Sequence, residues 1–195
     1  LDETWLRERA YPMLKGVAEL YRTSPNLEKG EDGKFHIHGV NSHEPLWGAS
    51  DTMEELAAMR GILPLAVRAS EILGVDGGLR PGWQDVGDNL APYPLSSDPD
   101  AVDFHRHPSG RPTWAQGLKP CALVCCDFSP TFVRPAVHYD LLTLETDDPE
   151  ARRIAADTFE STPRYSGFKH GEPARSEHPM AAPMLARPED VRTML

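Results

Sequence analysis

Residues 51–73, with the sequence DTMEELAAMRGILPLAVRASEIL, carry the longest helical pattern in the chain. Apolar and small residues recur there at intervals of three and four, the spacing of one helical face. These positions are Leu56, Met59, Leu63, Val67 and Ser70. The pattern predicts one long helix whose apolar side is buried against the rest of the domain.

The ends of this helix carry their own signals. Asp51, followed three residues later by Glu54, is typical of a capping box at a helix N-terminus. Gly74 suits the left-handed position that follows a helix, and Pro64 predicts a bend within it.

The segment before this helix, residues 35–51, reads FHIHGVNSHEPLWGASD. Gly39 and Pro45 exclude a helix, so we expect a loop that a rigid helix holds in place. His36 and His38 alternate as on an extended segment, which places both side chains on the same side. Loops of this kind, rich in polar and aromatic groups, are where ligand chemistry is usually found.

Further helices are indicated on both sides of this region. Residues 5–21 show a helical face that Pro12 should kink or break near position 10 or 11. Other segments with helical patterns are residues 83–90, 149–159, 178–186 and 188–195. Residues 121–128 and 137–144 are short apolar runs that fit a helix or a strand equally well. About five helices and few convincing strands predict an all-α domain of helix pairs, with long loops gathered on one face.

Composition limits the function. The 195 residues suffice for one domain with a substantial core, and the net charge of −10 argues against nucleic acid as a partner. No apolar run is long enough to span a membrane. The three cysteines, Cys121, Cys125 and Cys126, are odd in number and form no CxxC motif, so we expect neither a disulfide framework nor a structural zinc site.

The chain begins with Leu1 rather than Met, and Leu195 falls in an expected helix. We therefore expect a fragment of a longer protein, with the remainder of the same polypeptide as its partner. The lack of a signal peptide then says nothing about localisation.

Several motifs, taken in order, resemble one known family. They are Tyr11–Glu19 (YPMLKGVAE), Asn41–Glu44 (NSHE), Asp51–Leu56 (DTMEEL), Trp83 with Leu90–Pro94 (LAPYP), and His138–Leu142 (HYDLL). Their order and spacing are similar to those of the six-hairpin glycosidases, most of all to the catalytic domain of glycoside hydrolase family 95, the α-L-fucosidase and α-L-galactosidase group. The resemblance implies that residues 1–195 form about half of a single (α/α)₆ barrel, and that the protein is periplasmic or secreted.

The resemblance also implies inverting hydrolysis of α-L-fucoside-like or related glycosides in oligosaccharides or polysaccharides, with Glu44 as the general acid. Asp140 is the candidate base, although a cap or a surface carboxylate fits it equally well. Glu177 is a weaker candidate for the same role. The family's Ser-Pro-Glu turn is Ser-His-Glu here, and the HYDLL segment keeps only one histidine, His138. The family's paired asparagines would lie before Leu1.

Five side chains are candidates for substrate binding: His36, His38, Asn41, Trp47 and His138. Trp47 is placed to stack on a sugar, and Asn41 fits a turn residue as well. We expect these groups to line one cleft with Glu44. A metal held by His36 and His38 is the alternative, but we expect no metal and no cofactor, because the spacing matches no strong zinc pattern.

Two other functions remain open. A polysaccharide lyase on a related α/α toroid would need a Tyr or His at the sugar C5 position and a group that neutralises a uronate. The small number of arginines near residues 35–51 disfavours it. A non-catalytic sugar-binding half-barrel is the other alternative.

Overall fold

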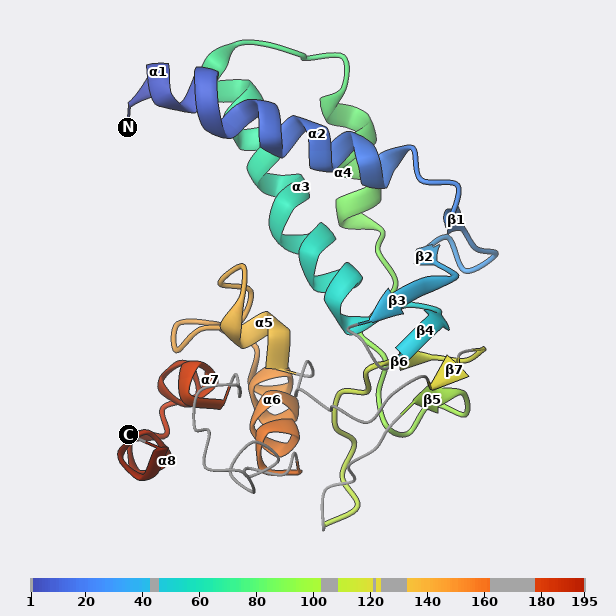
Figure 1. Cartoon of the computed structure of the whole chain (residues 1–195), viewed down its shortest axis with the longest axis vertical. Coiled ribbons are helices and arrows are strands. Elements are labelled where there is room, and N and C mark those ends of the chain that lie inside the picture. Colours follow the sequence, from blue (N-terminus) through green and yellow to red (C-terminus); the bar gives the residue numbers. More distant parts are fainter. Residues whose placement is uncertain are drawn as a thin grey trace.

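The computed structural model describes residues 2–42, 46–102, 109–120, 122–123, 133–161 and 178–194. Helices and short strands alternate along the chain (Figure 1). The helices are α1 (Glu3–Trp5), the π-helix η1 (Leu6–Ala10), α2 (Tyr11–Arg22), α3 (Met53–Leu73), α4 (Arg80–Asp88), α5 (Arg134–Val137), α6 (Pro149–Ser161), α7 (His178–Met184) and α8 (Pro188–Met194). The strands are β1 (Leu27–Lys29), β2 (Phe35–Ile37), β3 (Val40–Ser42), β4 (Leu46–Ala49), β5 (Ala101–Val102), β6 (Gly117–Leu118) and β7 (Ala122–Leu123).

The prediction of an all-α half-barrel is wrong, because the described residues form a mixed α and β fold. The strands make three small antiparallel sheets: β1–β2, β3–β4–β7 and β5–β6. The strands of residues 35–49 replace the expected loop. Each strand has only two to four residues, and an apolar–polar alternation over so few positions looks the same as a loop sequence.

The long helix α3 confirms the central prediction of the sequence. Leu56, Leu63 and Val67 are buried, and Gly74 follows the helix with a positive φ of 64°. The predicted capping box is wrong: the N-terminal cap residue is Thr52, and its side chain makes no capping hydrogen bond. The Asp51 carboxylate instead accepts a hydrogen bond from the backbone N–H of Ile37 at 2.9 Å.

The predicted break near Pro12 is present as the π-helix η1. Pro12 has no N–H, and in an α-helix its ring would clash with the carbonyl of Glu8. The chain relieves this by a π-turn directly before the proline, in which the N–H of Tyr11 bonds to the carbonyl of Leu6.

Helices α2 and α4 both pack along α3 and form the upper half of the molecule (Figure 1). The fully buried Trp83 of α4 fills the space between them, and its indole N–H donates to Glu19 of α2 at 2.7 Å. The core there continues through Ala18 and Leu63. A short helix was expected at residues 83–90, and α4 confirms it with an earlier start.

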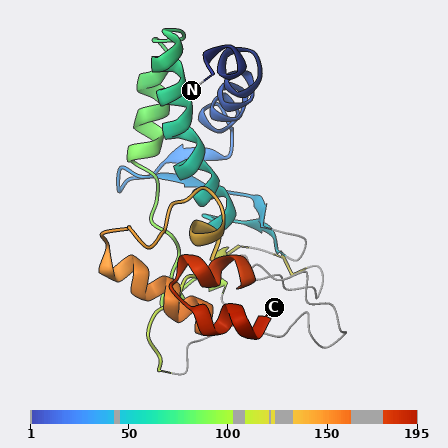
Figure 2. The ribbon, with the colours of Figure 1, turned by 90° about the vertical axis from the view of Figure 1, so that its left-hand side faces the viewer.

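The C-terminal helices form the other end of the molecule, where α7 and α8 pack together away from α2 (Figure 2). The predicted helices at residues 149–159, 178–186 and 188–195 are present as α6, α7 and α8. A second core joins this part to the start of α3 through Met53, Trp114, Ala136, Leu142 and Ile154. None of the helices among the described residues has the length and hydropathy needed to cross a membrane.

Candidate functional site

The candidate acid Glu44 lies in the sequence between strands β3 and β4. Val40 pairs with Ala49 and Ser42 pairs with Leu46, so residues 43–45 connect two paired strand ends. These three residues, Glu44 included, lie outside the described part of the chain. The hairpin therefore fixes both ends of the segment that carries Glu44.

A β-bulge shapes the second strand of this hairpin. Between the two register pairs, Trp47 and Gly48 on β4 lie opposite the single residue Asn41 on β3. Gly48 has a φ of 73°, a backbone conformation that residues other than glycine rarely adopt. Its N–H donates to Oδ1 of Asn41 at 3.2 Å. Asn41 thus has a contact within the hairpin, and Trp47 is left half exposed.

Three hydrogen-bonded side-chain pairs connect Ser42, the last residue of β3, to α3 and to the end of α5. The buried Ser42 Oγ donates to Glu54 Oε2 at 3.3 Å. The other carboxylate oxygen of Glu54 lies 2.7 Å from Nη2 of Arg134. Nη1 of Arg134 lies 2.7 Å from Nε2 of His138. We call Ser42, Glu54, Arg134 and His138 the polar chain.

The polar chain sets the hydrogen-bonding role of one ring nitrogen of His138. A guanidinium has only N–H donors, so Nε2 of His138 accepts the hydrogen bond from Arg134. The structure thus connects two sequence candidates, His138 and the hairpin of Glu44, through two residues that the sequence analysis had not assigned to the site.

The turn after α5 has an unusual backbone. Tyr139 and Asp140 have φ angles of 70° and 51°, the left-handed region that residues other than glycine rarely occupy. The Tyr139 side chain lies against α3 at Gly61, where an added Cβ would come within 2.5 Å of the tyrosine Cβ. This close approach requires glycine. Asp140, the candidate base, is exposed at the same turn.

A half-buried polar pair, Tyr21 and Glu55, lies beside the polar chain. The hydroxyl of Tyr21 donates to Oε2 of Glu55 at 2.6 Å. Burial and then this hydrogen bond raise the pKa of Tyr21 well above its usual value, so the phenol stays protonated. Glu54 and Glu55, adjacent in the first turn of α3, are therefore both engaged with other elements of the fold.

His36 and His38 lie side by side, as their alternation predicted, with ring centres 6.2 Å apart. Nδ1 of His36 lies 2.6 Å from the buried Asp51, and its Nε2 lies 3.2 Å from Asp32. Nδ1 of His38 contacts Ser50 at 2.9 Å. Both histidines thus contact the segment between the hairpin and α3, and a role in substrate binding stays a prediction.

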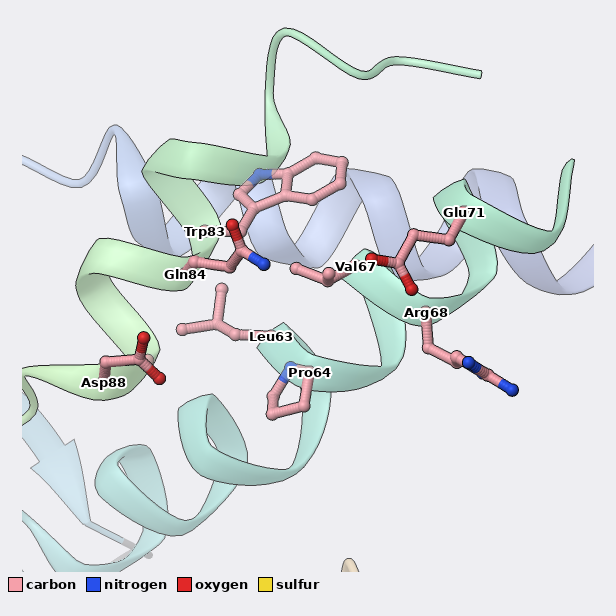
Figure 3. Close-up of a pocket in the computed structure, with 9 residues that line it drawn as sticks. Leu63, Pro64, Val67, Arg68, Glu71, Trp83, Gln84 and Asp88 are labelled. Atoms are coloured by element: carbon pink, nitrogen blue, oxygen red, sulfur yellow. The ribbon is translucent and has the colours of Figure 1, made fainter. Parts of the chain in front are cut away.

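None of the predicted site residues that the structure describes lines the cavities at α3–α4, at α3–α6 or at the start of α6. The first, of about 270 Å³, lies between α3 and α4 (Figure 3). Leu63, Val67 and Trp83 lie between the two helices, and the polar ends of Glu71 and Gln84 lie around them. The second, of about 390 Å³, lies between α3, residues 92–95 and α6.

Other sequence candidates lie outside the described residues: His43, His105, His107, Glu177, Cys121, Cys125 and Cys126. Among the residues that are described, no three or more His, Cys, Asp or Glu side chains are grouped to hold a metal ion.

The sequence analysis missed Glu54 and Arg134 as members of the site. Glu54 looked like half of a capping box, and Arg134 precedes an apolar run whose secondary structure was ambiguous. Arg134 followed by Pro135 is a signal for the first turn of a helix, and it could have located α5.

Comparison with known proteins gives no relative: no family model matches the chain, and no curated protein matches it. The function must therefore be argued from the residues and their geometry.

Proposed function

We propose that this protein is an inverting glycoside hydrolase acting on α-L-fucoside-like or related glycosides of oligosaccharides or polysaccharides, with Glu44 as the general acid. The observation that carries the proposal is the polar chain. It joins Ser42, two residues before Glu44, to His138, so two segments that the sequence marks as site candidates meet at the start of α3.

Glycoside hydrolysis by inversion needs two carboxyl groups and a surface for the sugar. Glu44, which the sequence places between β3 and β4, supplies the acid. The exposed indole of Trp47, three residues later on β4, offers the apolar face on which a sugar ring packs. Asp140 is the candidate base, because it follows His138 by two residues and is open to solvent.

The polar chain gives this arrangement its rigidity. An acid must be held within hydrogen-bond reach of the leaving oxygen, and small displacements reduce the rate strongly. Anchoring the hairpin through the buried Ser42 to an ion pair on α3 and α5 restricts such displacement.

The test is Glu44→Gln in the full-length protein, assayed on two substrates. Glutamine keeps the shape of the side chain but has no proton to give to the leaving oxygen. General acid catalysis contributes about 10²- to 10⁴-fold, so kcat on a natural disaccharide linkage should fall by that order. An activated aryl glycoside needs little protonation, and its rate should fall much less.

The matched control is Glu31→Gln, the same change in the exposed β1–β2 turn. It should leave both rates unchanged. Equal losses of rate on the two substrates for Glu44→Gln would show that Glu44 contributes to substrate binding or to the stability of the fold, and not to proton donation. The proposed mechanism would then be wrong.

A further inference from the structure

The cavity between α3 and α6 has the size and lining of a small-molecule site. Its volume is about 390 Å³, within the range of about 300–1,000 Å³ that is usual for ligand pockets. Most of its wall is apolar, contributed by residues such as Leu142 and Ile154. Arg60, Tyr93 and Trp114 line it as well. The carboxylates of Asp148 and Glu150 stand at its exposed edge, where Asp148 caps α6 and Glu150 pairs with Arg153.

Arg60 brings a largely buried positive charge to this cavity. Its Nη2 donates to the carbonyl of Ala91 at 2.5 Å, and its guanidinium carbon lies 4.4 Å from the centre of the Tyr93 ring. Among the described residues, no carboxylate forms an ion pair with it. Burial lowers the pKa of Arg60, which means that the surroundings disfavour the charge. A buried cation without an anion is costly, and a bound anion would relieve that cost.

Tyr93 adds an unused hydrogen-bonding group. Its hydroxyl is buried and has no hydrogen-bond partner within the described structure. Burial raises the pKa of Tyr93 to about 12, so the hydroxyl keeps its proton and can donate it. The ring of Trp114 meets the Tyr93 ring edge to face, with centres 5.6 Å apart, and extends the aromatic wall.

We propose that this cavity binds a small monocarboxylate about the size of one sugar ring, such as a hexuronate. The carboxylate would lie against Arg60, a ligand oxygen would accept from the Tyr93 hydroxyl, and the ring would pack on Trp114. This inference does not rest on the proposed glycosidase activity, because the cavity shares no residue with the hairpin or the polar chain.

Calorimetric titration of the full-length protein with D-galacturonate and D-glucuronate tests the inference. The controls are D-galactose and D-glucose, which differ from the probes in the carboxylate alone. We expect the uronates to bind at least tenfold more tightly than their neutral parents. Equal binding of acid and parent, or no binding of either, would overturn the inference.

Variants identify the site. Tyr93→Phe removes only a hydroxyl that has no partner in the described structure. The thermal midpoint should therefore stay the same or rise, while the affinity for the uronate falls about 3- to 10-fold. Arg60→Met should abolish binding, whereas Arg68→Met, the same change on an exposed part of α3, should leave it intact. If Arg60→Met fails to fold, Tyr93→Phe still decides the matter: unchanged uronate affinity in that variant would refute the site.

Discussion

His36 lies between two carboxylates that come from different parts of the chain. Asp32 belongs to the β1–β2 turn, and the buried Asp51 directly precedes the cap of α3. Burial alone lowers the pKa of His36, but the hydrogen bond and charge of Asp51, together with those of Asp32, outweigh burial and raise the pKa above 6.5. The imidazolium therefore ties the first hairpin to the start of the long helix.

This arrangement makes stability depend on pH. Because the pKa in the folded state exceeds the unfolded value of 6.5, His36 stabilises the fold fully below pH 6.5 and loses that contribution as the pH rises through the folded pKa. Urea unfolding of the wild type and of His36→Gln at a series of pH values checks this. The difference between their unfolding free energies should be largest in acid and shrink above neutrality. A difference that grows with pH would contradict the assignment.

At the residue scale, the sequence predicted what depends on local spacing. The burial of Leu56, Leu63 and Val67 and the shared side of His36 and His38 follow from helix and strand periods. The role of Asp51 could not be read in this way. Its carboxylate bonds Ile37 and His36 instead of the helix N-terminus, and that choice depends on a strand that approaches from elsewhere in the chain.

Among the elements, the start of α6 is determined by a signal within a few residues of the sequence. The Oδ1 atom of Asp148 accepts hydrogen bonds from the backbone N–H groups of Glu150 and Ala151, at 3.1 and 3.0 Å. The helix predicted from residue 149 begins at Pro149, and its start signal is local, because both the cap and the proline act within four residues.

The cap yields a direct prediction. Asp148→Ala should lower the free energy of unfolding by about 1 kcal/mol, since two backbone donors lose their acceptor. Asp147→Ala, the same change one residue earlier, should cost far less, because Asp147 caps nothing. Thermal or urea unfolding measures both. Equal losses for the two variants would mean that charge rather than capping explains the effect.

The strands of residues 27–49 show where element prediction fails. The β1–β2 and β3–β4 pairs form between residues that are apart in the sequence, as in the pairing of Glu28 with His36. Strands of three or four residues have too few positions to establish a period, and Gly48 marks a bulge only once its partner strand is known.

For the whole molecule, the pair of Glu54 and Arg134 is a polar contact between α3 and α5. Both side chains are largely shielded from solvent, and Arg134 also bonds His138. Hydrogen bonds to charged groups contribute about 1.5–3 kcal/mol. We therefore expect a coupling energy of that order in a double-mutant cycle of Glu54→Gln and Arg134→Met. The exposed pair of Lys29 and Asp85 should show about 0–1 kcal/mol.

Contacts such as this one also explain why the fold class was predicted wrongly. The helices were located from local patterns, but their arrangement depends on contacts between distant segments, such as Glu54 with Arg134. A chain of helix pairs and a mixed fold with small sheets have nearly the same local patterns. A coupling energy near zero would show that the two halves meet without help from this pair.

The product of hydrolysis tests the central claim most directly. Proton NMR can follow the anomeric signal as the full-length protein cleaves an α-L-fucoside, before the free sugar equilibrates. Inversion through a water between Glu44 and its partner base predicts that β-L-fucose appears first. First appearance of α-L-fucose would contradict the inverting mechanism, and no release of fucose from any α-L-fucoside offered would contradict the proposed substrate.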